Sequence, residues 1–146
     1  MEKIQFDSGV QSYILNGGEV LRFNPADPNI YARFSEAAEK ITDLEKTLVA
    51  DAQALSGEET GKGVLTLFAR ADEEMKKLLS WVFGTGNDFH KLLQGVNLLA
   101  VADNGQRVIT NFLEAVQPIL LAGAERCIRE KEKEAVEKAN RRRKSQ

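Results

Sequence analysis

The chain has 146 residues, of which 42% are hydrophobic and 29% charged, and its formal net charge is −2. A chain of this length and composition can form one globular domain with its own core, so we predict a single domain over residues 1–146. No apolar stretch approaches the roughly 20 residues of a membrane helix, and the lone Cys127 cannot form an internal disulfide.

The N-terminal residues lack the apolar segment of a secretory signal, which predicts a protein of the cytoplasm. Charge is distributed unevenly: residues 1–124 hold 11 basic and 17 acidic residues, a net −6, whereas residues 125–146 hold 9 basic and 5 acidic, a net +4. The basic cluster Arg141, Arg142, Arg143 and Lys144 is either a solvated chain end or a contact for an acidic partner. The acidic body, and the absence of aromatic residues from this cluster, argue against nucleic-acid binding.

The first 24 residues have the pattern of short β-strands. Ile4 and Phe6 alternate with polar neighbours, and two further short runs, 13–15 and 20–23, flank Asn16-Gly17-Gly18. Asn-Gly favours the positive φ angles of a tight hairpin turn. We therefore predict a hairpin region of two or three strands in residues 1–24.

Helical patterns occupy most of the remaining chain. Asp27 is suited to an N-cap and Pro28 to the first helical position, which predicts a helix over residues 28–55. Its predicted buried stripe is Ile30, Phe34, Ala37, Ile41, Leu44 and Leu48.

After a glycine-containing break at residues 56–63, a second helix is expected over residues 64–83. Its predicted buried face is Leu65, Phe68, Met75, Leu78, Leu79 and Val82, with Trp81 beside it. Asn87 or Asp88 can cap a short helix over residues 89–94.

The run from residue 96 to residue 102 is apolar and too short for periodicity to distinguish a helix from an extended segment. Burial is favoured, because exposed apolar patches are uncommon on monomers. The alternative is a partner-binding edge, whose contact residues would be Val96, Leu98, Leu99 and Val101. Asp103-Asn104-Gly105 then predicts a turn.

A long final helix is predicted from Gln106, with Val108, Phe112, Val116 and Ile119 as its apolar stripe and a kink or local break at Pro118. Residues 128–146 form a charged, exposed extension of that helix. The predicted fold is thus mainly α: a short N-terminal β-hairpin, a helical body over residues 28–127, and a long charged C-terminal helix.

No motif for a cofactor, a metal or catalysis is convincing. His90 and Cys127 could form a catalytic pair only if the fold brought them together, and a cysteine at the edge of an apolar stripe usually acts as a small hydrophobe. Residues 57–63 (GEETGKG) lack the glycine spacing, the following Ser or Thr and the preceding strand of a phosphate-binding loop. The Glu58-Glu59 and Glu73-Glu74 pairs are expected to be solvated. We therefore predict a protein that is not an enzyme and uses no cofactor.

Several segments, taken together in order, are similar to a known group of proteins. They are Leu21–Phe34 (LRFNPADPNIYARF), Trp81–Gly86 (WVFGTG), Asn104–Gln106 (NGQ) and Asn111–Pro118 (NFLEAVQP). In this order the chain resembles the small tail assembly chaperones encoded by siphophages and prophages of Gram-positive bacteria. The likeness covers about residues 20–120 and transfers no residue-level binding site.

The resemblance implies an interaction protein of the bacterial host's cytoplasm. It would bind the phage tape measure protein and keep it soluble while the tail tube assembles, with the tail tube protein as a further candidate partner. An alternative is a structural tail completion or connector component of the phage particle, and a third is a small enzyme that uses Cys127 or His90. The helix stripes also suit packing between copies, which leaves a homo-oligomer open.

Overall fold

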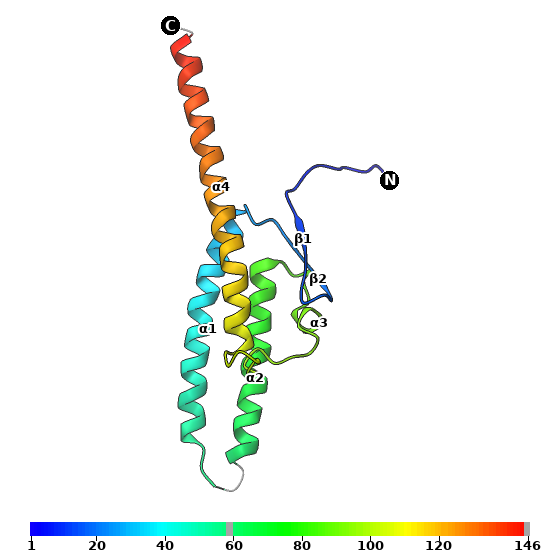
Figure 1. Ribbon diagram of the computed structural model, residues 1–146, viewed down its shortest axis with the longest axis vertical. Coiled ribbons are helices and arrows are strands. Elements are labelled where there is room, and N and C mark those ends of the chain that lie inside the picture. The colour runs from blue at the N-terminus through cyan, green and yellow to red at the C-terminus, as the bar shows by residue number, and fades with distance from the viewer. Residues whose placement is uncertain (58–59, 145–146) are drawn as a thin grey trace.

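The computed structural model describes residues 1–57 and 60–144, and it is mainly helical (Figure 1). The elements, in chain order, are β1 (Gln11–Ile14), β2 (Val20–Phe23), α1 (Pro28–Ala54), α2 (Thr60–Phe83), α3 (Phe89–Leu92) and α4 (Val108–Lys144). The predicted fold class, a β-hairpin followed by helices with a long C-terminal helix, is confirmed.

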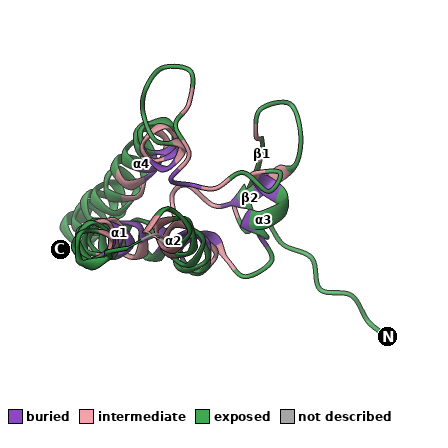
Figure 2. Ribbon diagram, turned by 90° about the horizontal axis from the view of Figure 1, so that it is seen from below, coloured by how far each residue is buried: buried purple, intermediate pink, exposed green. Residues whose placement is uncertain are grey.

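Three long helices form the body. Helices α1 and α2 lie side by side, the first half of α4 packs with them, and the hairpin and α3 sit together to one side (Figures 1 and 2). The second half of α4 continues past the start of α1 with no helix beside it (Figure 1). The buried side chains lie where the three helices face one another and under the hairpin (Figure 2).

The hairpin forms where the sequence predicts it. Asn16 and Gly17 have φ angles of 49° and 73°, and Gly18 N donates to the Leu15 carbonyl at 2.9 Å, so Asn-Gly makes the tight turn. The described sheet has two strands, in which Ile14 pairs with Val20. Residues 1–10 form no strand, so the third strand that the sequence pattern allowed is absent from the described residues.

Helix α1 follows its sequence signals closely. The Asp27 carboxylate accepts from Asn29 N at 2.9 Å, and Pro28 occupies the first turn. The predicted stripe is confirmed: Ile30, Phe34, Ala37, Ile41 and Leu48 are buried and Leu44 is partly buried.

Helix α2 departs from the prediction at its start. It begins at Thr60 rather than Val64. Residues 60–63, which belong to the predicted break at residues 56–63, are therefore helical. Leu65 is 69% exposed and Trp81 is 41% exposed, although both were expected at or beside the buried face. The first turns of α2, to which Leu65 belongs, extend beyond the start of α4 and lie beside α1 (Figure 1).

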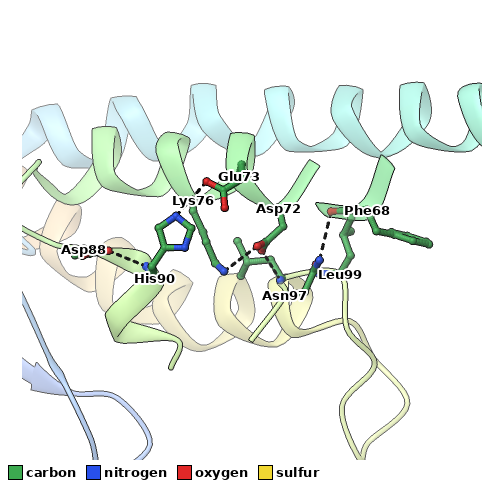
Figure 3. A network of polar contacts seen from close by, with 9 residues as sticks. Phe68, Asp72, Glu73, Lys76, Asp88, His90, Asn97 and Leu99 are labelled. Atoms are coloured by element: carbon green, nitrogen blue, oxygen red, sulfur yellow. Dashed lines mark hydrogen bonds and ion pairs between the residues drawn. The ribbon is translucent and has the colours of Figure 1, made fainter. Parts of the chain in front are cut away.

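Two charged residues of α2 are buried, which the apolar pattern did not predict. Asp72 Oδ2 lies 2.8 Å from Lys76 Nζ, and Asp72 Oδ1 accepts from Leu98 N at 2.8 Å (Figure 3). One carboxylate therefore pairs with a buried cation on its own helix and also holds the backbone of the segment that leads to α4. Both oxygens are used, as burial of a charged group requires.

The segment after α3 is neither a regular helix nor a strand. Asn97 Oδ1 accepts from Leu99 N at 2.8 Å, and Asn97 Nδ2 donates to the Phe68 carbonyl at 3.3 Å (Figure 3). Leu98 O accepts from Ile109 N at 2.8 Å, which ties the segment to the first turn of α4. Side-chain and backbone hydrogen bonds from two helices thus replace regular secondary structure here.

The hairpin is fastened to the end of α2 by one amide side chain. Asn87 Oδ1 accepts from Arg22 N at 3.0 Å, and Asn87 Nδ2 donates to Arg22 O at 2.9 Å and to Phe83 O at 3.0 Å. Asp88, rather than Asn87, caps α3. Contacts among aromatic rings from the hairpin, α2, α3 and α4 then join the hairpin to the body; the rings are those of Tyr13, Phe23, Phe83, Phe89 and Phe112.

Helix α4 begins at Val108 and runs without a break through Pro118 (Figure 1). The predicted local break is therefore wrong. Pro118 removes the hydrogen bond to the carbonyl of Glu114, but both residues lie on the exposed side, where water can satisfy that carbonyl. Further along, Gly123 is buried against the turn before α1, and a Cβ added there would lie 1.7 Å from the Pro25 carbonyl oxygen.

We expect Gly123→Ala to destabilise the protein by at least about 1–3 kcal/mol, because the added methyl group meets backbone that must move. Gly61→Ala is the matched control: it is also a glycine in a helix, but its Cβ would meet nothing within 4 Å. The control should be neutral or stabilising by up to about 1 kcal/mol. Urea unfolding followed by the fluorescence of Trp81 measures both, and equal effects would contradict the close contact at Pro25.

We expect Asp72→Leu to cost about 3–5 kcal/mol, because it leaves the Lys76 ammonium buried without a counter-charge. The double variant Asp72→Asn with Lys76→Met should recover most of this loss, since the asparagine can still accept from Leu98 N–H and no charge stays buried. The same unfolding measurement compares them. A single variant as stable as the double would show that the ion pair is dispensable.

Candidate functional site

The four apolar residues predicted as partner contacts in the segment after α3 fall into two groups. Leu98 and Leu99 are buried in the core, at 0% and 4% exposure, whereas Val96 and Val101 are 44% and 63% exposed. The buried pair lies in the middle of the irregular segment, and the exposed valines lie on either side of it. In this conformation a partner can touch Val96 and Val101 but not the two leucines.

The basic residues predicted as partner contacts lie elsewhere. Arg141, Arg142 and Arg143 belong to the last turn of α4 and are exposed at its far tip, remote from Val96 and Val101 (Figure 1). Arg141 Nη2 lies 3.9 Å from Glu137 Oε2. Cations in the last turn of a helix interact favourably with its dipole. The two groups of predicted contact residues therefore do not form one surface.

The residues considered for catalysis are also apart. His90 Nε2 lies 3.2 Å from Glu73 Oε2 on the surface, and Asp88 accepts from His90 N at 3.0 Å (Figure 3). Cys127 lines a different hollow, beside Pro28. His90 lines a hollow with Trp81 and Phe89, and that hollow does not include Cys127.

Other features considered in the sequence are structurally ordinary. Glu58 and Glu59 lie outside the described residues. Residues 60–63, the last part of the glycine-containing segment 57–63, form the start of α2. Within residues 1–57 and 60–144, no three His, Cys, Asp or Glu side chains gather so that they could hold a metal ion. No helix in these ranges is long and apolar enough to cross a membrane.

An open hollow lies between the start of α1 and the second half of α4, and we call it the α1–α4 groove. Its volume is about 680 Å³. It is lined by Pro28, Tyr31, Leu121, Ala124, Glu125, Cys127, Ile128, Lys131, Glu132 and Ala135. Apolar side chains form its floor, and charged side chains of both signs stand at its rim.

The groove exists because α4 is longer than the body against which it packs. Leu121, Ala124, Ile128 and Ala135 recur at spacings of three, four and seven residues, which places them on one face of the helix. Leu120 and Gly123, on the neighbouring face, are buried against the body. Ile128, by contrast, is 58% exposed and Leu121 42%, since no described element covers this face.

No family model, no curated protein and no solved structure matches this chain. Its candidate site therefore depends on geometry alone, and the α1–α4 groove is the candidate because apolar residues of two helices line a hollow of about 680 Å³. The groove was not predicted because the predicted apolar stripe of the last helix ended at Ile119. The continued spacing of Leu121, Ala124 and Ile128 was the available signal.

The charged end of α4 should be dispensable for folding. All described residues from Arg129 onward are exposed, and the Lys131–Glu134 and Arg141–Glu137 ion pairs join neighbours along the same helix. Such pairs contribute little to stability. We expect a chain truncated after Ile128 to keep its unfolding midpoint in urea within experimental error, and a large loss of stability would show that this segment packs against the body.

Proposed function

We propose that this protein is a tail assembly chaperone that binds helical segments of a phage tape measure protein and keeps them soluble during tail tube assembly in the host cytoplasm. The ordered sequence likeness over about residues 20–120 motivates the proposal. The structural observation that carries it is the α1–α4 groove, an open apolar hollow beside a helix that extends past the body.

The chemistry of the groove suits an amphipathic helix. Helix-in-groove recognition needs an elongated apolar floor that accepts side chains spaced three, four and seven residues apart. Tyr31 from α1 and Leu121 and Ile128 from α4 provide such a floor. A tape measure protein carries long apolar helical stripes that have no cover until tube protein surrounds them, so a partner of this shape lowers their tendency to aggregate.

The rim of the groove is compatible with several related segments. Glu125 and Glu132 offer negative charge, and Lys131 offers positive charge, within the same lining. Mixed rim charges select weakly among partners, whereas a buried apolar centre supplies most of the affinity. This suits a chaperone that covers successive stretches of one long helical protein.

We expect Leu121→Asp combined with Ile128→Asp to abolish the solubility that the wild-type chain gives to a co-expressed tape measure fragment, because two buried charges would replace the apolar contacts. Leu65→Asp is the control, since Leu65 is also an exposed apolar helix residue but does not line the groove. Pull-down and size-exclusion chromatography give the readout. A fragment that gains no solubility from the wild-type chain would contradict the function itself.

The alternative role, a tail completion or connector component, is favoured by one observation. The outer edge of β1 is open, and proteins of assembled rings can pair at such edges. Mass spectrometry of purified particles separates the two roles. A virion component is present in fixed copy number, whereas a chaperone is absent or present in traces.

A further inference from the structure

We infer that copies of this protein associate head to tail, with the N-terminal segment of one copy (residues 3–7) adding as a third strand to the outer edge of β1 in the next copy. This inference goes beyond the proposed function and does not depend on it. Three features of the described chain carry it: a strand edge without a partner, an apolar groove beside that edge, and an exposed segment with a matching pattern.

The outer edge of β1 is the free edge of the described sheet. Leu15 N donates to Glu19 O at 2.9 Å, toward β2. Because backbone groups alternate in direction along a strand, those of Ser12 and Ile14 point to the outer edge. The opposite edge of the sheet is closed, since Asn87 pairs with both the N–H and the carbonyl of Arg22.

A groove lies between this sheet and the first half of α4, and its volume is about 490 Å³. We call it the hairpin groove. Its lining from the hairpin includes Tyr13, Ile14 and Leu15, and its lining from α4 includes Phe112 and Ile119. None of the lining residues is charged. Ile14 of β1 lines this groove, so a third strand added to β1 would lie beside a residue of the groove.

The N-terminal segment matches this groove in both pattern and charge. Ile4 and Phe6 are 89% and 80% exposed, and on a strand they would lie on one face. Lys3, Gln5 and Asp7 would lie on the opposite face, toward solvent. The stretch from Ile4 to Phe6 is uncharged, as is the groove, so no charge is desolvated on binding.

The segment points away from its own body, which favours a second copy as its acceptor. Asn24 Nδ2 donates to Ser8 O at 2.9 Å, and Gly9, at φ 74°, packs so tightly on Asn24 that an added Cβ would lie 2.6 Å from Nδ2. Asp7 Oδ1 accepts from Gly9 N at 2.8 Å. These contacts direct residues 1–6 outward, away from the hairpin groove of the same chain (Figures 1 and 2).

An interface in which one surface inserts into a different surface of the next copy is heterologous, and it extends into rings or open chains. Each copy gives its N-terminal segment to one neighbour and accepts a segment from another. The association should therefore depend on concentration and involve more than two chains. Blocking the segment on one copy and the edge on the other should stop it at pairs.

The test uses the full chain alone, so its outcome is independent of any tape measure protein. The segment variant is Ile4→Asp with Phe6→Asp, and the edge variant is Ser12→Pro, which removes an outward N–H but no hydrogen bond of the hairpin. The control, Val49→Asp with Leu65→Asp, places the same charges on exposed residues of α1 and α2. Sedimentation velocity over a concentration series measures the assembly state of each.

We expect wild type and control to associate, each test variant alone to lose association by at least about tenfold, and an equimolar mixture of the two test variants to form pairs. A wild-type chain that stays monomeric, a segment variant that associates like wild type, or a mixture that forms no pairs would overturn the inference. If the edge variant misfolds, a peptide of residues 1–7 replaces it. That peptide should break wild-type assemblies, and failure of the peptide to compete would also overturn the inference.

Discussion

The buried carboxylate of Asp72 is the interaction on which the rest of the fold depends. It neutralises Lys76 within α2 and accepts a hydrogen bond from the backbone of Leu98, so one side chain fixes the point at which the irregular segment crosses the helix. The Leu98 carbonyl in turn accepts a hydrogen bond from Ile109 N, in the first turn of α4. A buried ion pair adds little net stability compared with apolar packing, but removing one partner is costly because the other charge stays buried.

The length of α4 relative to the body then determines where apolar surface is left uncovered. The helix starts partway along α2, crosses the turn before α1 at Gly123, and continues beyond it (Figure 1). Leu120 and Gly123 are buried against the body, whereas the neighbouring face with Leu121 and Ile128 has only the first turn of α1 beside it. The α1–α4 groove is a consequence of this mismatch in length.

The hairpin illustrates the same division between closed and open surfaces. Its β2 edge is closed by the side chain of Asn87, and its apolar face joins the aromatic contacts that end at Phe112. Its β1 edge has no comparable cover, and Asn24 directs the preceding residues outward. A two-stranded sheet is marginal by itself. Anchoring on one edge therefore lets the other stay available without unfolding the hairpin.

The sequence by itself determined the features that depend on local chemistry. Asn16-Gly17 made the hairpin turn, Asp27-Pro28 started α1, and the spacing of its apolar residues placed that helix's buried face. Tertiary packing was needed to show that Asp72 and Lys76 are buried and that Leu65 is exposed. It also separates Leu98, which is buried, from Val101, which is exposed. Periodicity reports which face of a helix is apolar, but burial requires a neighbour. Whether a neighbour is present depends on the relative lengths and crossing points of helices far apart in the chain.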